Sequence, residues 1–533
     1  MKKKIRLDVL AAILFGVLLL LGCEAWAHAA TYYVRPDGGT AAQCTGLANA
    51  AYSGTGTACA FNHPYQLLPP NGSAEPLQPT VMQSGDTLMI ASGSYMMGYG
   101  APGQTSAGCA TPYTWDCEIS NIPSGTAAAP TTITGDCAAP PELWATQRAA
   151  AIFNIVNAHD IKIACLELTD HANCIEFYKP TANTGGVTAC QRDTYPYGTW
   201  GASGIYAKSV ANLTLANLNI HGFADYGILA GSLSGNTTVS NVTLRANGWG
   251  GWSGDLGGNT GEWSDSGTLA FDHFVVAWNG CAEAYPATTI VGCWGQNEGG
   301  YGDGVGQSKT GGNWTFTSST FAHNTQDGLD LLYADGTGSV SVDHSVAWQN
   351  AGNQIKTSGN ASLTYSVVNG YCNNWQGFPI YGDGSSGVAG SMCRADGVAV
   401  VMLFNAAGQT AKLDHDTITG NGDALFNGGV SDNAPAGWQP DASDVTAWSN
   451  TIALGQTSVI PRDDGGLTAL DWYSDGTYAG TVTYKNNVIY NVKGGFCPPG
   501  NICKDPLLKN ATLAGFDPTL LQGSPAIGAG VTP

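Results

Sequence analysis

The sequence has few charged residues for its length, and positive charge is especially scarce. Only 11% of the 533 residues are Asp, Glu, Lys or Arg, and Lys and Arg together number 20 against 40 acidic residues. Non-specific nucleic-acid binding needs a basic surface, so this balance excludes nucleic acid as a partner. The acidity keeps an exported protein in solution. If the ligand is itself a polyanion, a cation between protein and ligand would compensate the repulsion between them.

Stretches with the Leu, Glu, Lys and Ala spacing of amphipathic helices are also scarce. Glycine, in contrast, contributes 73 residues, and Asn, Ser and Thr are abundant. Gly and Asn tolerate positive φ and therefore serve turns. The composition predicts an all-β protein with many short strands joined by many turns.

An apolar run near the N-terminus has the features of an export signal. Basic residues between Lys2 and Arg6 precede the run at 9–21, which is too short for a comfortable transmembrane helix. We interpret residues 1–30 as a signal peptide. Two cleavage sites compete within it, because 20–23 resembles a lipobox that would lipidate Cys23, whereas 27–29 fits ordinary signal peptidase. The prediction is a secreted, extracellular or periplasmic protein without a transmembrane segment, or an outer-membrane lipoprotein.

The cysteines indicate an oxidising compartment. The chain has 15 cysteines, and removal of Cys23 leaves an even number. Zinc is the alternative, but no paired Cys-x-x-Cys motif or nearby His ligands occur. Cysteines close in sequence are expected to form the disulfides Cys44–Cys59, Cys109–Cys117, Cys174–Cys190, Cys281–Cys293, Cys372–Cys393 and Cys497–Cys503, which leaves Cys137 and Cys165.

The central region repeats itself. Segment 211–222 (ANLTLANLNIHG) returns as 235–246 (GNTTVSNVTLRA), 24 residues later. Each unit holds short alternating apolar strands and then an Asn or Gly turn, and a single unit cannot bury its apolar side. Propeller blades need roughly 40 or more residues, and the Leu and Asn spacing of leucine-rich repeats is absent. The period predicts a right-handed parallel β-helix, a single-stranded solenoid.

Both ends of the chain resemble those of secreted right-handed β-helix proteins. Segments 31–39 and 84–95 are similar to their opening segments, and 523–530 is similar to their closing tail. We expect one structural domain and a monomer, with loop insertions at 371–396 and 430–480. The expected division is a signal peptide at 1–30, an N-terminal cap with the first coils at 31–150, the parallel β-helix at 151–503 and a C-terminal tail at 504–533.

Three successive repeats place acidic residues in matched register. The segments 301–306, 325–330 and 351–356 are offset by 24 and 26 residues, one coil each. This register predicts two stacked columns, which are Asp303, Asp327 and Asn353 in one and Gly306, Asp330 and Lys356 in the other.

Neighbouring coils are about 4.8 Å apart, so the stacked carboxylates need a compensating positive charge. Ca²⁺ takes oxygen ligands of this kind. Aspartate before glycine is also a common turn residue that merely caps backbone groups. The matched columns therefore predict a calcium site beside Lys356, with turn capping as the structural alternative.

The same residues resemble the family 9 polysaccharide lyases, which are pectate lyases. The similar segments are Gly302–Gly304, Asn324–Leu331 and Gly352–Lys356. The resemblance implies Ca²⁺ as cofactor, Asp303, Asp327, Asp330 and Gln326 as its ligands, and Lys356 as the Brønsted base. Gln326 stands where the family has Asp, and Leu329 where it has Trp. The implied substrate is an acidic polysaccharide, pectate first, with alginate or another uronate polymer as alternatives.

Two other functions compete with this interpretation. Residues 324–330 also echo the Asn-Thr-Asp-Gly-x-Asp motif of polygalacturonases, but the adjacent Asp-Asp, Gly-His-Gly and Arg-Ile-Lys elements of that family are missing. Hydrolysis needs a positioned carboxylate pair and would not need Lys356. The other alternative is a non-catalytic carbohydrate-binding or adhesive surface protein, for which Gln326 and lipidation of Cys23 would be the supporting features.

Overall fold

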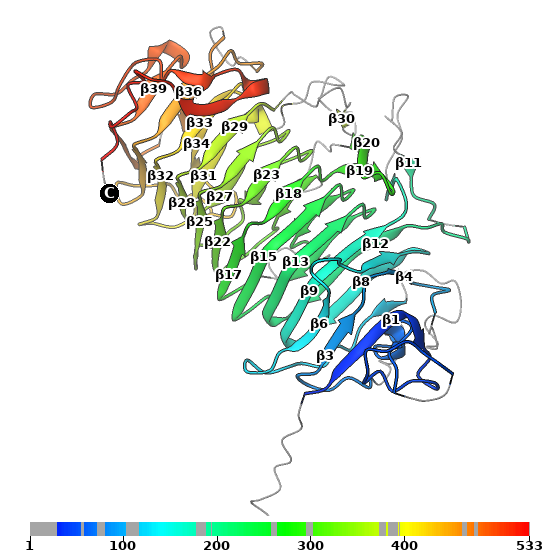
Figure 1. Cartoon of the computed structure of the whole chain (residues 1–533). Coiled ribbons are helices and arrows are strands. Elements are labelled where there is room, and N and C mark those ends of the chain that lie inside the picture. The colour runs from blue at the N-terminus through cyan, green and yellow to red at the C-terminus, as the bar shows by residue number, and fades with distance from the viewer. Residues whose placement is uncertain are drawn as a thin grey trace, which may run out of the picture.

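The chain winds into a right-handed parallel β-helix, as the repeat period predicted (Figure 1). The computed structural model describes residues 29–54, 58–71, 80–102, 117–176, 188–192, 194–256, 264–294, 302–372, 380–381, 393, 395–460, 466–473 and 478–531. These residues form strands and short 3₁₀ turns, the latter at η1 (Pro64–Gln66), η3 (Ala395–Gly397), η5 (Lys493–Gly495) and η6 (Leu513–Gly515).

Each full coil contributes a strand to each of three parallel ladders, which we call the first, second and third faces. The first face contains β1 (Thr31–Gly39), β3 (Thr87–Ile90), β6 (Thr131–Gly135), the first parts of β9 (His159–Asp170), β13 (Ala211–His221) and β15 (Asn236–Arg245), then β17 (Thr268–Asp272), β22 (Asn313–Thr317), β25 (Ser339–Asp343), β28 (Asn360–Thr364), β32 (Thr410–Asp414), β35 (Val445–Ser449) and β38 (Thr481–Lys485).

The second face begins with β4 and β7 and continues through the later parts of the three long strands. Its members are β4 (Ser94–Met97), β7 (Glu142–Ala145), the ends of β9, β13 and β15, then β18 (Val275–Ala277), β23 (Thr320–Ala322), β26 (Val346–Trp348), β29 (Val367–Gly370), β33 (Thr417–Gly420), β36 (Ile452–Gly455) and β39 (Val488–Tyr490).

The third face is a separate sheet and carries the residues of the candidate site. Its members are β2 (Pro70–Asn71), β5 (Glu118–Ile119), β8 (Ala149–Val156), β12 (Gly201–Lys208), β14 (Tyr226–Gly231), β16 (Gly250–Ser253), β21 (Asp303–Gly306), β24 (Leu329–Leu331), β27 (Ile355–Ser358), β31 (Val400–Phe404), β34 (Ala424–Val430) and β37 (Ala469–Tyr473). Within this face, β2 and β5 pair antiparallel.

Small sheets decorate the coils. The pair β10 (Cys174–Ile175) and β11 (Thr188–Ala189) is parallel. The hairpin β19 (Cys281–Ala284) and β20 (Thr289–Trp294) is extended by β30 (Ile380–Tyr381). The pair β40 (Leu508–Asn510) and β41 (Asp517–Leu520) is antiparallel and belongs to the C-terminal tail. The sheet of β19, β20 and β30 therefore joins two insertions that are far apart in sequence, since Cys293 pairs with Ile380.

The bend between the first and second faces has a simple backbone cause. One residue per coil stands there in the left-handed region, with φ between +47° and +60°, in the column Cys165, Asn217, Asn241, His273, Ser318, His344, Tyr365, His415, Asn450 and Asn486. Asn and His enter this region more readily than most residues. The repeated Asn and His of the sequence therefore mark a corner of the coil.

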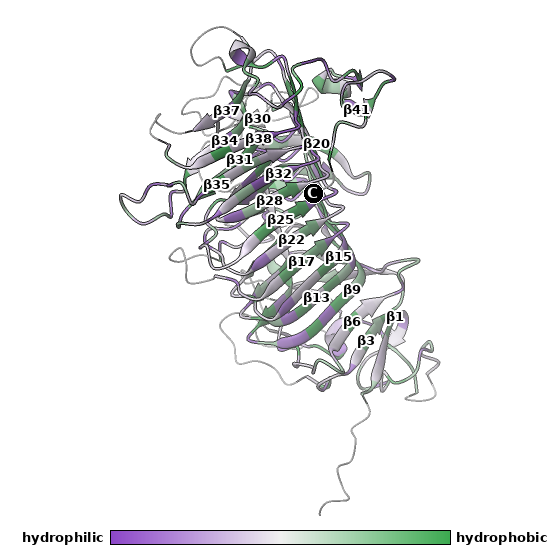
Figure 2. Cartoon of the chain, turned by 90° about the vertical axis from the view of Figure 1, so that its left-hand side faces the viewer, coloured by the Kyte–Doolittle hydropathy of each residue, from purple (hydrophilic) through white to green (hydrophobic). Residues whose placement is uncertain are grey.

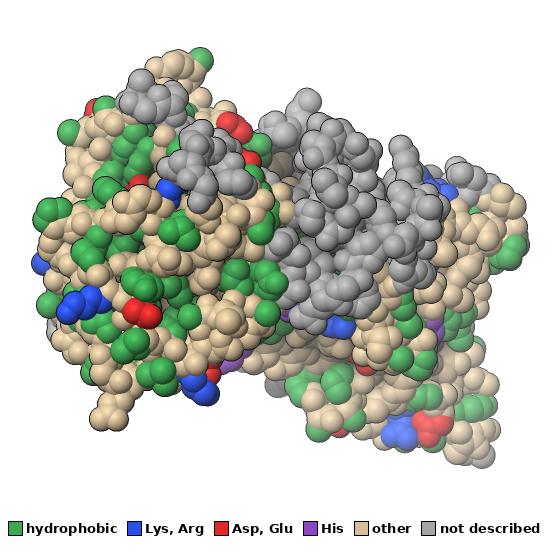
Figure 3. Space-filling view, turned by 90° about the horizontal axis from the view of Figure 1, so that it is seen from above, with side chains coloured by type: hydrophobic (Ala, Val, Ile, Leu, Met, Phe, Trp, Pro, Cys, Tyr) green, Lys and Arg blue, Asp and Glu red, His purple; other side chains and the backbone are tan. Residues whose placement is uncertain are grey.

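Inward-pointing side chains stack in rows and form one continuous core. One such row on the first face is fully buried and consists of Leu215, Val239, Phe271, Phe316, Val342, Leu363, Leu413 and Trp448. Figure 2 shows the result as apolar and polar bands that cross successive strands. Charged side chains are few and scattered on the face seen in Figure 3, in line with the low charge content.

The predicted disulfides are largely confirmed. Five pairs proposed from sequence proximity are formed, and the two remaining cysteines pair as Cys137–Cys165. Cys109 lies outside the described residues, and so do residues 1–28 with Cys23 and most of the proposed signal peptide. No helix among the described residues is long and apolar enough to cross a membrane.

The prediction of a loop insertion at 430–480 is wrong. This segment contains all of β35, β36 and β37, which form a regular coil, and the added residues lie between β34 and β35, at 431–444, and between β36 and β37. These two additions hid the repeat, because they lengthen the spacing between equivalent strands.

Candidate functional site

A ladder of buried asparagines sets the entry to the third face. Asn247, Asn279, Asn324 and Asn350 stack in successive coils, and each of the first three donates from Nδ2 to Oδ1 of the next at 2.8–3.0 Å. All four are fully buried, so their amide groups must be paired. The ladder fixes each turn three residues before Asp327 and Asn353.

The strands after this ladder have the predicted register. Gly306 pairs with Asp330, and Asp330 pairs with Lys356, on β21, β24 and β27. These three positions form one column on the outer surface of the third face. The structure therefore brings Asp330 and Lys356 together from adjacent coils.

In the other predicted column, that of Asp303, Asp327 and Asn353, each aspartate carboxylate binds the backbone of the next coil. Oδ1 of Asp303 accepts the backbone N–H of Asp327 at 2.9 Å, and Oδ1 of Asp327 accepts that of Asn353 at 2.6 Å. Asp303 and Asp327 thus cap backbone groups, which is the structural role considered above. Each cap occupies one oxygen of a carboxylate, so the other oxygen remains for a second function.

The glycines after these aspartates are required by close coil packing. A Cβ on Gly304 would lie 2.4 Å from the carbonyl oxygen of Gly328, and one on Gly328 would lie 2.5 Å from that of Gln354. A Cβ on Gly306 would approach Oδ2 of Asp303 at 2.7 Å. The Asp-Gly repeats therefore allow the carboxylates to approach one another across the coils.

Lys356 is the immediate counter-charge of this cluster. Its Nζ lies 3.0 Å from Oδ2 of Asp327 and 2.8 Å from Oδ2 of Asp330. Burial lowers the pKa of Lys356, but the carboxylates of Asp327, Asp330 and Asp303 outweigh it, so the net shift is upward. Without another cation, the amine is held as an ammonium.

Burial and the same proximity raise the pKa of Asp303 and of Asp330. Burial, followed by repulsion from Asp327 and Asp330, raises the pKa of Asp303 well above its ordinary value. Burial raises the pKa of Asp330 to about 6, although Lys356 acts in the opposite direction. One lysine therefore does not fully balance three carboxyl groups.

The donor set fits a hard divalent cation. Ligand oxygens of Asp303, Asp327 and Asp330 lie within 4.8 Å of one another, and they are the one such acidic or histidine cluster among the described residues. Oε1 of Gln326 is buried at the same site and has no hydrogen-bond partner. Three carboxylates and an unpartnered amide oxygen are the ligand chemistry that Ca²⁺ prefers.

A cavity of about 260 Å³ opens over this cluster. It is lined by residues of β14, β16, β21, β24 and β27 and of the turns next to them, namely Tyr226, Ser253, Asp255, Asp303, Gly306, Gln307, Ser308, Gln326, Asp330, Tyr333 and Lys356. Burial raises the pKa of Tyr333, and Asp432 and Asp330 add to the increase. The cavity thus combines carboxylates, one amine and hydroxyl groups over several coils.

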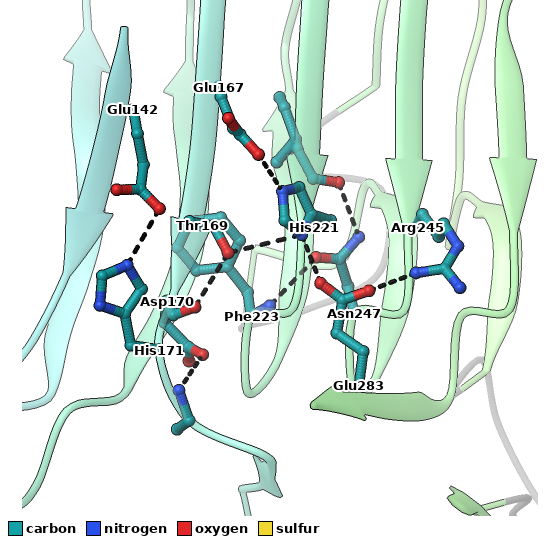
Figure 4. A network of polar contacts seen from close by, with 12 residues as sticks. Glu142, Glu167, Thr169, Asp170, His171, His221, Phe223, Arg245, Asn247 and Glu283 are labelled. Atoms are coloured by element: carbon teal, nitrogen blue, oxygen red, sulfur yellow. Dashed lines mark hydrogen bonds and ion pairs between the residues drawn. The ribbon is translucent and has the colours of Figure 1, made fainter. Parts of the chain in front are cut away.

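A second polar network was not found from the sequence (Figure 4). His221 on β13 lies 2.9 Å from Oε1 of Glu167 through Nε2 and contacts Glu283 through Nδ1, while Arg245 contacts the other oxygen of Glu283. Burial lowers the pKa of His221, but the two glutamates raise it to about 9 overall. Because Glu283 belongs to β19, the network anchors the β19–β20 hairpin to the second face.

Comparison with known proteins gives no family assignment. The chain matches no protein-family model, and no curated protein matches it. Similar solved structures include the pectate lyase Pel9A, with 14% identity over 91% of this chain and 84% of that one and a TM-score of 0.37. An alginate lyase from Paenibacillus sp. has 12% identity over 78% of this chain and 93% of that one, with a TM-score of 0.35. The GH136 lacto-N-biosidase from Eubacterium ramulus has 10% identity over 86% and 67%, also with 0.35.

Proposed function

We propose that the chain is a secreted polysaccharide lyase that cleaves an acidic, uronate-containing polysaccharide by calcium-assisted β-elimination, with pectate as the first candidate polymer. The observation that carries the proposal is the contact of Lys356 with Asp327 and Asp330 beside Asp303, at the floor of a cavity on the third face. An elimination of this kind needs a base and a group that stabilises the enolate of the uronate.

Asp303, Asp327, Asp330 and Gln326 would hold the calcium ion. Bound there, Ca²⁺ would engage the uronate carboxylate, stabilise the charge that develops on it, and compensate the carboxylates that keep Lys356 protonated. The backbone caps on Asp303 and Asp327 keep one oxygen of each carboxylate fixed, which pre-organises the other.

Lys356 is the proposed base. As a neutral amine it removes the proton from C5 of the uronate, and the C4–O4 bond then breaks to leave a double bond between C4 and C5. Its side chain is only 17% exposed, which limits competition from water for the amine. Asp327 and Asp330 position Nζ from two directions.

The direct test is ultraviolet absorbance of the unsaturated uronate, with purified residues 31–533 on polygalacturonate and on alginate. We expect absorbance to rise with Ca²⁺ and to stay flat with chelator. A folded protein that gives a flat trace across a panel of uronate polymers contradicts the proposal and favours a carbohydrate-binding protein instead.

A glycoside hydrolase is the second candidate, and the raised pKa of Asp330 favours it. A carboxyl group with a pKa of about 6 can act as a general acid near neutral pH. The oxygens of the cluster lie within 4.8 Å of one another. Inverting hydrolases keep their carboxyl groups roughly 6.5–9.5 Å apart, so this spacing does not match an inverting mechanism. New reducing ends without a rise in absorbance would identify hydrolysis.

A further inference from the structure

The elimination leaves one proton transfer without a donor. When C4–O4 breaks, O4 departs as an alkoxide unless an acid protonates it. Because C4 and C5 are adjacent atoms of one sugar ring, that acid must reach the same ring as Lys356. The acid is therefore expected among the groups that line the cavity close to β24 and β27.

Tyr333 meets this condition. It lines the cavity together with Lys356 and Asp330 and follows β24 by two residues, so it lies in the coil adjacent to that of Lys356. Tyr226 lines the same cavity from β14, which is three coils before β24. At about 4.8 Å per coil, Tyr226 is roughly 14 Å farther along the helix.

The turn that carries Tyr333 is held by side-chain hydrogen bonds to the carbonyls on both sides of it. The carbonyl of Leu332, on one side of Tyr333, accepts from Ser431 Oγ at 3.0 Å. The carbonyl of Ala334, on the other side, accepts from Ser358 Oγ at 3.1 Å, Asn433 Nδ2 at 2.8 Å and Asn405 Nδ2 at 2.5 Å.

These donors come from three later coils. They converge on the two carbonyls next to Tyr333, while the carbonyl of Tyr333 itself accepts from the N–H of Thr310 at 3.3 Å. A loop that needs only to close a coil does not require this convergence. Such support is expected where a side chain must be placed accurately over a site.

The phenolic hydroxyl of Tyr333 is available to donate a proton to a substrate in the cavity. This hydroxyl donates to no residue that the structure describes, and the ring is half-buried at the rim of the cavity. A phenol has an ordinary pKa of about 10, so it is protonated at neutral pH and is a far stronger acid than the hydroxyls of Ser253 and Ser308 in the same cavity.

We propose that Tyr333 is the catalytic acid of the elimination and donates its phenolic proton to the departing O4. This inference rests on the proposed lyase function and adds the missing partner of Lys356. The C5–H bond breaks and an N–H bond forms on Lys356, the electron pair forms C4=C5, C4–O4 breaks, and O4 takes the proton from Oη of Tyr333. The phenolate then regains a proton from the Lys356 ammonium, so no external acid or oxidant is consumed.

The test is the fate of the C5 proton in heavy water. The mature chain and its Tyr333→Phe, Lys356→Ala and Tyr365→Phe variants are incubated with the accepted polymer and Ca²⁺ in D₂O. Elimination is followed by absorbance, and deuterium at C5 of recovered substrate is followed by NMR. Tyr365 is an exposed tyrosine at the corner of the first and second faces and serves as the matched control.

We expect Tyr333→Phe to lower kcat by roughly 10²–10⁴-fold, the usual contribution of a general acid, with little change in KM. Deuterium should still enter C5 of unreacted substrate, because Lys356 continues to remove that proton. Lys356→Ala should abolish both exchange and elimination, and Tyr365→Phe should match the wild type.

Three results would overturn the role of Tyr333. If Tyr333→Phe loses exchange and elimination together, Tyr333 only positions the substrate. If it retains full kcat, another group is the acid. If the wild type itself produces no unsaturated product, the lyase proposal fails and the inference fails with it. The first two results leave the lyase function intact, so the two failures are distinguishable.

Discussion

Nζ of Lys356 lies 2.8 Å from Oδ2 of Asp330, directly across the pairing of β24 with β27. The two residues are 26 positions apart in sequence and are paired in space, and each favours the charged form of the other. In the absence of a divalent cation this contact neutralises part of the carboxylate cluster. The same contact places an amine beside the site where a uronate would be bound.

Replacement of Lys356 with alanine should abolish turnover and retain binding of the polymer. The variant removes the proposed base while the carboxylates and the cavity remain, so we expect kcat to fall by at least roughly 10²-fold with little change in affinity. Turnover and polymer binding are measured side by side, with Lys412→Ala on the first face as the control. Unchanged turnover in Lys356→Ala would remove the lysine from the mechanism.

Replacement of Asp303 with asparagine should stabilise the metal-free protein and remove its response to calcium. Asparagine can still accept the N–H of Asp327, but it eliminates a buried like charge. We expect Tm in chelator to rise and the calcium-dependent increase in Tm to disappear. Asp272→Asn, at an exposed position on the first face, is the control and should keep the calcium response. A full calcium response in Asp303→Asn would exclude Asp303 as a ligand.

Replacement of Gln326 with aspartate should tighten calcium binding. Oε1 of Gln326 is buried without a partner, and a carboxylate at this position would add one negative charge to the donor set. An improvement of roughly tenfold in Kd corresponds to about 1.4 kcal/mol. Calorimetric titration of calcium measures it, with Gln326→Leu expected to weaken binding. If both variants bind calcium as the wild type does, Gln326 lies outside the coordination sphere.

The network around His221 should make stability fall at alkaline pH. Its pKa is about 9 in the folded chain against an ordinary value of 6.5, so its stabilising contribution is complete below pH 6.5 and is lost as the pH rises through about 9. The contribution is on the order of 3 kcal/mol at most. Urea unfolding from pH 6 to 10 should show this slope in the wild type and in His344→Gln, an exposed control.

The matched variant is His221→Gln, which cannot titrate. It should be less stable than the wild type near pH 6, because the buried Glu283 loses one of its two charged partners and keeps only Arg245. Its stability should change little between pH 6.5 and 9. A slope equal to that of the wild type would mean that another group titrates.

Much of the site could be predicted because a β-helix turns sequence spacing into spatial register. Asp303 and Asp327 lie one coil apart, as do Asp330 and Lys356, and one-coil intervals place side chains in columns. The corner residues were visible only as repeated Asn and His, since their role depends on a left-handed φ that spacing does not reveal. The contribution of Asn324 to the asparagine ladder was likewise hidden within a motif that was interpreted through its aspartates.

The network of Figure 4 could not be predicted for a different reason. Glu283 reaches His221 from an inserted hairpin, and an insertion has no fixed register with the coils that it covers. The same limitation applies to Tyr333, whose turn is held by Asn405, Ser431 and Asn433 from later coils. Contacts made by loops depend on where each loop folds back, and the repeat period carries no information about that.

The most direct test of elimination is the mass of the products formed in water enriched in heavy oxygen. Elimination breaks C4–O4 without adding water, so the products should be one water lighter than those of hydrolysis, should carry no heavy oxygen from bond cleavage, and should appear only with Ca²⁺. Saturated products that have gained one heavy oxygen at each break would contradict β-elimination and show that the chain is a hydrolase.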